Sequence, residues 1–365
     1  MGGRQQRLSR DADRALRHAP ADEDVPSAGR PERPLPPHLP AGHRDPARGD
    51  RRTYRHRPCD GGAPRGRCLR ASDRPYHAVD RQPAPPDRRR PAGGAGVTPS
   101  TRFDSRIGLG HFTFLDHSPV ELVRLARASG FGFVGLRFHP VAPGLPHWLP
   151  DAAGLAELGS VMAGEGIGLY DIETVVIDEG FDPESLVPAL DAAARLGARR
   201  VNTCADLFPA LPERFARVCT LAAEHGLAMD VECMTWRGVN TPAACLALIA
   251  DAGAANAGYL VDMLHHARCG GTPDDIARMP PGLVRSVQVC DAPATAPKGS
   301  EALLAEARGG RLLPGEGALP LRDTLRVLPP DTVISVELPN ASDPRDPLSR
   351  ARAIHTATAA LLRDL

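Results

Sequence analysis

Aromatic residues are scarce in this sequence, making up 4% of its 365 residues. Proteins that bind single-stranded nucleic acid stack bases on aromatic side chains, so this class is disfavoured and we expect no nucleic-acid partner. No run of about 18 apolar residues occurs, and we expect no membrane-spanning helix. The first residues also lack the apolar core of a secretory signal peptide. A cytoplasmic protein is the resulting expectation.

The cysteines lack the spacing of a zinc cluster. Six of the eight cysteines follow residue 100, and they stand singly, with no CxxC pair among them. Such isolated cysteines are typical of a reduced, intracellular setting rather than of a disulfide framework.

Positive charge is concentrated in one part of the chain. Residues 1–100 contain 21 Arg, no Lys and 12 acidic residues, a net charge of +9, whereas the remaining residues carry −9. The same segment holds 16 prolines and little apolar periodicity, so it cannot bury enough surface to offset its ordering entropy. We therefore predict a disordered low-complexity tail over residues 1–100. A basic arm attracted to nucleic acid or membranes is one interpretation; we favour a stretch that is not natively translated, with translation starting near "GVTPSTRFDSRIGLG".

The remainder, residues 105–365, alternates short apolar runs with amphipathic segments. Eight such units over about 260 residues predict an α/β fold, the (β/α)₈ or TIM barrel, with parallel strands covered by helices. An open doubly wound sheet is the alternative, but "GLGHFTF" lacks the GxGxxG turn that usually follows its first strand. The eight strand candidates are residues 106–114, 131–138, 168–177, 199–204, 227–234, 258–264, 284–290 and 332–338.

Helix signals lie between these strand candidates. Ser118 is a suitable N-cap for a helix over residues 118–130, and Gly130 is a suitable C-terminal stop. Further helices are expected at residues 183–197, 211–226, 241–253 and 346–365. The last of these would pack against the barrel or against a second copy, so a homo-oligomer is left open.

Polar residues stand near the ends of the last four strand candidates. These are Glu232, Asp262, Gln288 and Glu337, and the C-terminal strand ends of such a barrel meet at one rim. Buried carboxylates that lie together repel one another unless a cation sits between them. One divalent metal ion explains all four residues. The alternative for each acid is an arginine or a helix N-terminus as its partner.

Four stretches, "VECM", "LVDMLHHARCGGTPDDI", "VQVCDAP" and "RLLPGEGALPL" followed by "ISVELP", resemble the sugar phosphate isomerase/epimerase family, the xylose isomerase-like TIM barrels. The resemblance covers nearly all of residues 105–365. It implies that Glu232, Asp262, Gln288 and Glu337 bind the metal, and that Glu232, Glu337 and His265 are catalytic. Gln288 departs from the histidine of better-studied epimerases. Because the site then contains only oxygen ligands, Mn²⁺ or Mg²⁺ is favoured, with Zn²⁺ or Co²⁺ as alternatives.

Other strand-end residues are candidates for binding the substrate. An arginine at this rim can hold a carboxylate or phosphate through two hydrogen bonds, although a salt bridge to a neighbouring acid is the ordinary alternative. Arg308 stands before the "RLLPGEG" turn and Arg311 is its first residue; both are candidates for an anionic substrate end. The full set of predicted substrate-binding residues is Arg137, His139, His111, Glu173, Trp236 and Arg308.

These residues predict a divalent-metal-dependent isomerase or epimerase that abstracts a proton next to a carbonyl of a small sugar or sugar-derived substrate. A dehydratase (lyase) acting on a keto-polyol or dehydroshikimate-like acid is the alternative, so the expected partner is a carbohydrate or keto-acid. An endonuclease acting at apurinic sites is a remote alternative. Such enzymes hold three zinc ions with several histidines, whereas this domain has no His-x-His pair and a net negative charge that disfavours DNA.

Overall fold

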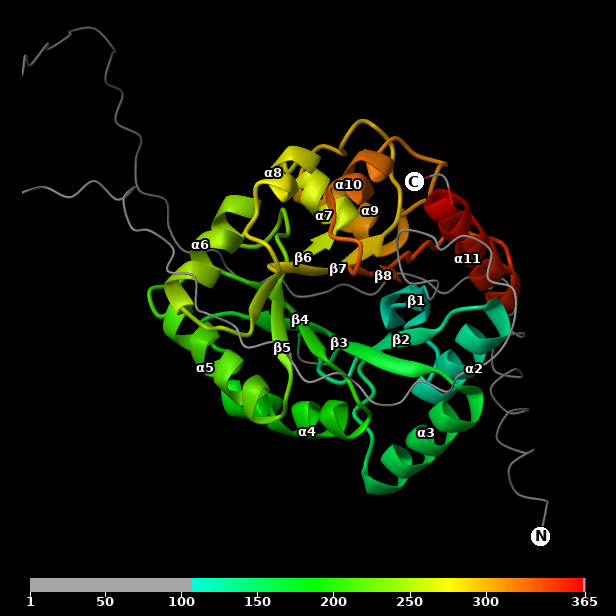
Figure 1. The fold of residues 1–365 in the computed structure, drawn as a ribbon, viewed down its shortest axis with the longest axis horizontal. Coiled ribbons are helices and arrows are strands. Elements are labelled where there is room, and N and C mark those ends of the chain that lie inside the picture. Colours follow the sequence, from blue (N-terminus) through cyan, green and yellow to red (C-terminus); the bar gives the residue numbers. More distant parts are fainter. Residues whose placement is uncertain (1–106, 143, 364) are drawn as a thin grey trace, which may run out of the picture. The chain divides into compact units, whose positions relative to one another are not determined.

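The computed structural model of the chain describes residues 107–142, 144–363 and 365. The predictions for residues 1–100 lie outside these described residues. Eight parallel strands follow one another around a closed barrel, and β8 pairs with β1 to complete it. Figure 1 shows the helices arranged around the outside of these strands. The predicted TIM barrel is confirmed.

All eight strand candidates contain a strand. The strands are β1 (Gly108–Leu109), β2 (Phe133–Leu136), β3 (Gly168–Ile177), β4 (Arg200–Ala205), β5 (Ala228–Val231), β6 (Ala257–Asp262), β7 (Val284–Val289) and β8 (Val333–Val336). β3 is buried from residue 169 to 177. Burial on both faces is what a parallel strand covered by helices requires, because one face meets the barrel interior and the other meets the helices.

The helices between the strands include several that the sequence analysis did not name. The structure contains η1 (His111–Phe114), α2 (Pro119–Ser129), α3 (Ala152–Glu165), η2 (Pro183–Leu186), α4 (Val187–Arg195), α5 (Leu211–Glu224), α6 (Pro242–Ala252), α7 (Met263–Arg268), α8 (Pro273–Ala277), α9 (Ser300–Gly309), α10 (Leu321–Val327) and α11 (Pro347–Arg363).

The ends of α2 are set by the residues predicted to set them. The Ser118 hydroxyl accepts from the Glu121 backbone N–H, and the Glu121 carboxylate in turn accepts from Ser118. This capping box satisfies donors that the first turn of a helix leaves free. At the other end Gly130 adopts a φ of 96°, a left-handed conformation that glycine reaches without a steric penalty.

Six of the eight strands end one to five residues before the predicted bounds, and the ends of β1 and β6 have a clear cause. β1 stops at Leu109, and the chain then bends into the short 3₁₀ helix η1, whose Phe112 N–H donates to the Glu173 carboxylate from β3. β6 stops at Asp262, because the Asp262 side chain accepts from the His265 backbone N–H and so begins α7. Both strands therefore end where a carboxylate becomes the partner of a helical backbone.

Polar side chains also lie on β3, β4 and β5, before the strand ends that carry the site. Arg200 forms an ion pair with Asp230, which is fully buried. Asp171 on β3 accepts a hydrogen bond of 3.1 Å from the Asn202 side chain on β4. Burial raises the pKa of Asp171 to about 7, against the partly opposing effect of the Asn202 hydrogen bond. This carboxyl is therefore held in an environment that disfavours its charge.

Among the described residues, no helix combines the length and apolar character needed to cross a membrane. The cytoplasmic location and the oligomeric state stay predictions.

Candidate metal centre and substrate pocket

Asp262 was expected to pair with a metal ion, an arginine or a helix N-terminus, and the structure shows the last two. Its Oδ1 accepts from the His265 backbone N–H at 2.9 Å, and its Oδ2 accepts from Arg311 Nη1 at 2.6 Å. Burial raises the pKa of Asp262, but the charges of Arg311 and His265 and the hydrogen bonds from both residues together outweigh burial and bring the pKa below its usual value. A helix N-terminus and an arginine thus both compensate the charge of Asp262 at the end of β6.

Arg311 lies at the centre of the acidic cluster rather than at its edge. Its side chain is 1% exposed, and besides Asp262 it forms an ion pair with Glu337, with Nη2 2.9 Å from Oε2. The same Nη2 lies 3.3 Å from His265 Nε2. Arg311 was predicted from the sequence to contact an anionic end of the substrate. Its guanidinium instead links the carboxylates that follow β6 and β8.

Among the described residues, no arginine or lysine forms an ion pair with Glu232. Its side chain is 2% exposed, and its Oε2 has no hydrogen-bond donor. Burial, together with the charges of Asp262 and Glu337, raises the pKa of Glu232 well above its usual value. One ligand atom each of Glu232, Asp262 and His265 lies within 4.8 Å of the other two. Three buried groups, one directly after β5, one at the end of β6 and one on α7, are therefore close enough to share one metal ion.

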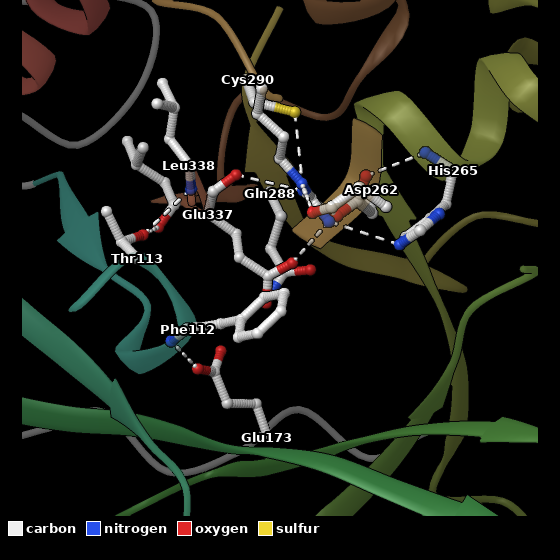
Figure 2. A network of polar contacts seen from close by, with 12 residues as sticks. Phe112, Thr113, Glu173, Asp262, His265, Gln288, Cys290, Glu337 and Leu338 are labelled. Atoms are coloured by element: carbon white, nitrogen blue, oxygen red, sulfur yellow. Dashed lines mark hydrogen bonds and ion pairs between the residues drawn. The ribbon is translucent and has the colours of Figure 1, made fainter. Parts of the chain in front are cut away.

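Gln288 and Glu337, the other two predicted ligands, contact each other. Gln288 Nε2 donates to Glu337 Oε1 at 3.4 Å, while Gln288 Oε1 is buried without a donor. Figure 2 shows Asp262, Gln288 and Glu337 turned toward one another, with His265 beside Asp262. Burial raises the pKa of Glu337 to about 8, although Arg311 opposes this.

These residues fit a divalent cation. The two orphaned acceptors, Glu232 Oε2 and Gln288 Oε1, are buried oxygen atoms that lack a donor, and such atoms are costly unless something pairs with them. The three carboxyl groups outnumber the single guanidinium of Arg311. The structure adds one candidate to the predicted ligands, because His265, assigned a catalytic role, also lies within ligand distance of Glu232 and Asp262.

A pocket of about 210 Å³ opens onto this cluster. Its lining includes Glu232, His265, Arg311 and Glu337. Three of the predicted substrate-binding residues also line the pocket: Arg137, Trp236 and Arg308. A larger hollow of about 430 Å³ is lined by the loop of residues 314–320, by α10 and by α11, but none of the predicted site residues lines it. We therefore place the site in the smaller pocket.

The Arg137 side chain, which follows β2, is 5% exposed, and its guanidinium carbon lies 4.6 Å from the centre of the Phe112 ring. Trp236 meets His265 edge to face, with ring centres 5.2 Å apart. Arg308, near the end of α9, is exposed. The pocket thus has the buried cation Arg137 beside an aromatic ring and the exposed cation Arg308, while Arg237 and the buried Arg311 also line it.

The other three predicted substrate-binding residues do not line the pocket. His111 is fully buried, and its ring nitrogens face the His117 carbonyl and the Arg137 backbone N–H, so it joins the end of β1 to β2. Burial lowers the pKa of His111 to about 4, which keeps it neutral. His139 packs edge to face on Phe181.

Glu173 is buried behind Phe112, whose N–H it binds at 2.6 Å (Figure 2). Burial raises its pKa to about 7. The pairing of β3 with β4 is irregular between Ile172 and Val175, and Thr174 and Val176 reach the pocket wall in its place. Sequence alternation alone does not reveal such an irregularity, because it shifts which side chains face the barrel mouth.

Asp291, shortly after β7, organises a loop beside the site. Its two carboxylate oxygens accept four backbone N–H groups, from Ala292, Gly315, Gly317 and Leu319, at 2.9–3.0 Å. Its backbone pairs in both directions with Leu312, directly after Arg311. Asp291 therefore folds the loop that carries Arg311 into the cluster. The Pro-Gly pair in "LLPGEG" was the available sequence signal for this loop.

Comparison with known proteins agrees with this architecture. Residues 123–360 match the family model described as xylose isomerase-like TIM barrel. Among curated proteins, no sequence gives a significant match.

Three similar solved structures cover about seven-tenths of this chain and nearly all of their own. The IOLI protein with a bound zinc atom is 16% identical, with a TM-score of 0.60, covering 71% of this chain and 98% of its own. L-ribulose 3-epimerase is 17% identical (TM-score 0.54; 72% and 95%). The probable 3-DHS dehydratase AsbF from Bacillus anthracis is 13% identical (TM-score 0.53; 69% and 98%). At these identities the structures show a shared fold, and the family match shows that the chain belongs to the xylose isomerase-like TIM barrels.

Proposed function

We propose that this protein is a divalent-metal-dependent isomerase or epimerase that abstracts a proton next to the carbonyl of a small sugar or sugar-derived substrate. The observation that carries the proposal is the pair of buried glutamates, Glu232 and Glu337, which line one pocket from β5 and β8. L-ribulose 3-epimerase shares the fold, which supports the same reaction class.

The metal ligands we propose are Glu232, Asp262, Gln288 and Glu337, with His265 close enough to join them. A bound dication would polarise the substrate carbonyl and stabilise the negative charge that develops on its oxygen. Because four of these groups offer oxygen, Mn²⁺ or Mg²⁺ is our preferred ion. Zn²⁺ is the alternative ion, because the similar IOLI structure contains a bound zinc atom.

The two glutamates serve as the base and the acid. One takes a proton from the carbon next to the carbonyl, and the other delivers a proton to the opposite face or to the neighbouring carbon. Both side chains are buried, and burial raises the pKa of each. Arg311 holds Glu337 in place, and His265 is positioned to donate to a substrate oxygen.

The test is exchange of substrate protons with deuterated water, after metal content has been measured, over a panel of ketoses and keto-acids. We expect Glu232→Gln and Glu337→Gln each to abolish exchange, because neither amide can accept the proton. Glu184→Gln is the matched control, since this exposed carboxyl pairs with Arg217 away from the pocket. Full exchange by Glu337→Gln would refute the assignment of two bases.

A dehydratase is the second candidate, favoured by the buried cation Arg137 in the pocket and by the fold shared with AsbF. It would begin with the same proton abstraction and then expel a hydroxyl group from the β-carbon. Loss of water with new ultraviolet absorption in the product would identify it. The endonuclease alternative gains no support, because His265 is the one histidine in the acidic group found among the described residues.

A further inference from the structure

Arg137 is a buried cation whose side chain has no hydrogen-bond acceptor among the described residues. Its Nε is buried and unpartnered, and its recorded side-chain contact is the face of Phe112. A guanidinium carries five donors, and burying it without acceptors costs free energy. A stacked aromatic ring returns only a part of this cost. Arg137 therefore lacks the partner that its burial calls for.

The nearby acids do not supply that partner. Glu173 and Glu337 both feel the charge of Arg137, which lowers their pKa values against the larger effect of burial. Neither forms an ion pair with it within 4.0 Å, whereas Glu337 pairs with Arg311 at 2.9 Å and Glu173 binds the Phe112 N–H. The guanidinium of Arg137 faces the pocket instead, as one of its lining residues.

Part of the pocket wall is apolar. Leu115, Val141, Leu145 and Pro146 line the same pocket. Beside apolar side chains a charged group of a ligand is poorly solvated. The charge of the Arg137 guanidinium therefore has a strong influence on which end of the ligand binds there. A fork with two parallel N–H donors matches a planar carboxylate.

We propose that the substrate carries a carboxylate group that binds Arg137, and is thus a small keto-acid or hydroxy-keto-acid rather than a neutral sugar. This inference rests on the proposed function for the reacting end of the substrate. Arg137 lines a pocket of about 210 Å³ together with the proposed bases Glu232 and Glu337.

The strand order sets the orientation of this substrate. Arg137 follows β2, which is separated from β8 and its Glu337 by β1 alone, while Glu232 follows β5 farther around the barrel. The carboxylate bound to Arg137 therefore lies on the Glu337 side. The carbonyl carbon lies farther toward Glu232 and Trp236, between the two proposed bases.

Binding without turnover tests the inference directly. D-glycerate and glycerol have the same carbon skeleton but differ in the carboxylate, and their binding to the full chain is measured by calorimetry with and without Mn²⁺. We expect glycerate to bind about 10- to 100-fold more tightly than glycerol, as a charge-assisted hydrogen-bonded pair allows. Arg137→Met should remove this preference and Arg137→Lys should restore part of it.

Arg308→Met is the matched control, because Arg308 lines the same pocket but is exposed. It should leave most of the preference intact. An unchanged preference in Arg137→Met with normal thermal unfolding would overturn the proposal. So would tighter, Arg137-dependent binding of glycerol 3-phosphate than of glycerate.

Deuterium exchange separates this inference from the proposed function. Hydroxypyruvate and dihydroxyacetone share an α-hydroxyketone, and the former carries a carboxylate. We expect faster exchange of hydroxypyruvate, lost in Arg137→Met. If dihydroxyacetone and hydroxypyruvate exchange equally fast in the wild type and in Arg137→Met, the carboxylate assignment is overturned and the proposed function stands. If glycerate binding depends on Arg137 but no compound of the panel exchanges protons, the proposed function is overturned and the carboxylate assignment stands.

Discussion

Replacing Arg311 by methionine tests the electrostatics of the cluster most directly. Methionine keeps much of the side-chain volume but removes the guanidinium that pairs with Asp262 and Glu337 at 2.6 and 2.9 Å. Both carboxylates are buried and would lose their cation. Breaking a buried ion pair from one side costs about 3–5 kcal/mol, because the remaining charge stays uncompensated.

The loss should be visible as a fall in the unfolding temperature. A domain of this size shifts by about 2–4 °C for each kcal/mol, so Arg311→Met should unfold about 6–20 °C below the wild type in the presence of a chelator. A divalent cation would then supply charge that the variant lacks. We therefore expect Mn²⁺ to stabilise Arg311→Met by more than it stabilises the wild type.

The assay is thermal unfolding followed by circular dichroism, with chelator and with excess Mn²⁺. Arg268→Met is the control, since Arg268 forms a comparably buried pair with Glu306, with Nη2 2.7 Å from Oε1. It should lose stability without gaining extra stabilisation from the metal. Equal stabilisation by Mn²⁺ of the wild type and of Arg311→Met would refute the charge balance that we assign to the cluster.

Two further predictions concern the barrel interior and the loop. The pKa of Asp171 is raised to about 7 by burial, so between about pH 4 and 7 the folded state holds a proton that the unfolded state releases. Stability should fall as pH rises through this window, by up to about 4 kcal/mol, and Asp171→Asn should remove this part of the slope in denaturant titrations. Asp291→Asn keeps one of the two oxygens that bind four N–H groups, so amide hydrogen exchange over residues 312–319 should accelerate and substrate exchange should slow. The exposed Asp323→Asn should change neither; unchanged protection in Asp291→Asn would contradict the role of Asp291.

The fold was predictable because its signals are local and repeated. β3 spans the ten residues that its apolar run predicted, and Ser118 and Gly130 limit α2 through hydrogen bonds and a backbone conformation that depend on neighbours in sequence. The strand ends that carry Glu232 and Asp262 follow from the same alternation. Where a carboxylate from one element bonds the backbone of another, as Glu173 does with Phe112, the sequence held no local signal, and β1 proved shorter than predicted.

The position of Arg311 depends on contacts that no local pattern describes. Its neighbours Leu312 and Gly310 form isolated bridges to Asp291 and Asn340, which follow β7 and β8 respectively. The Asn340 side chain also donates to the Arg311 carbonyl at 2.9 Å. These pairings join segments about 20–30 residues apart. The arginine therefore enters the cluster from a loop, where rules based on strand ends could not place it.

The position of Arg311 also limits how much metal the cluster can hold. If Glu232, Asp262 and Glu337 are ionised and Arg311 is protonated, their charges leave an excess of two negative charges. One divalent ion neutralises this excess, whereas three zinc ions would leave a large positive charge in a buried site. Gln288 strengthens the limit, because an amide adds an oxygen ligand without adding charge. The charges of Glu232, Asp262, Glu337 and Arg311 thus match a single dication, and metal titration of the purified protein should reach one ion per chain.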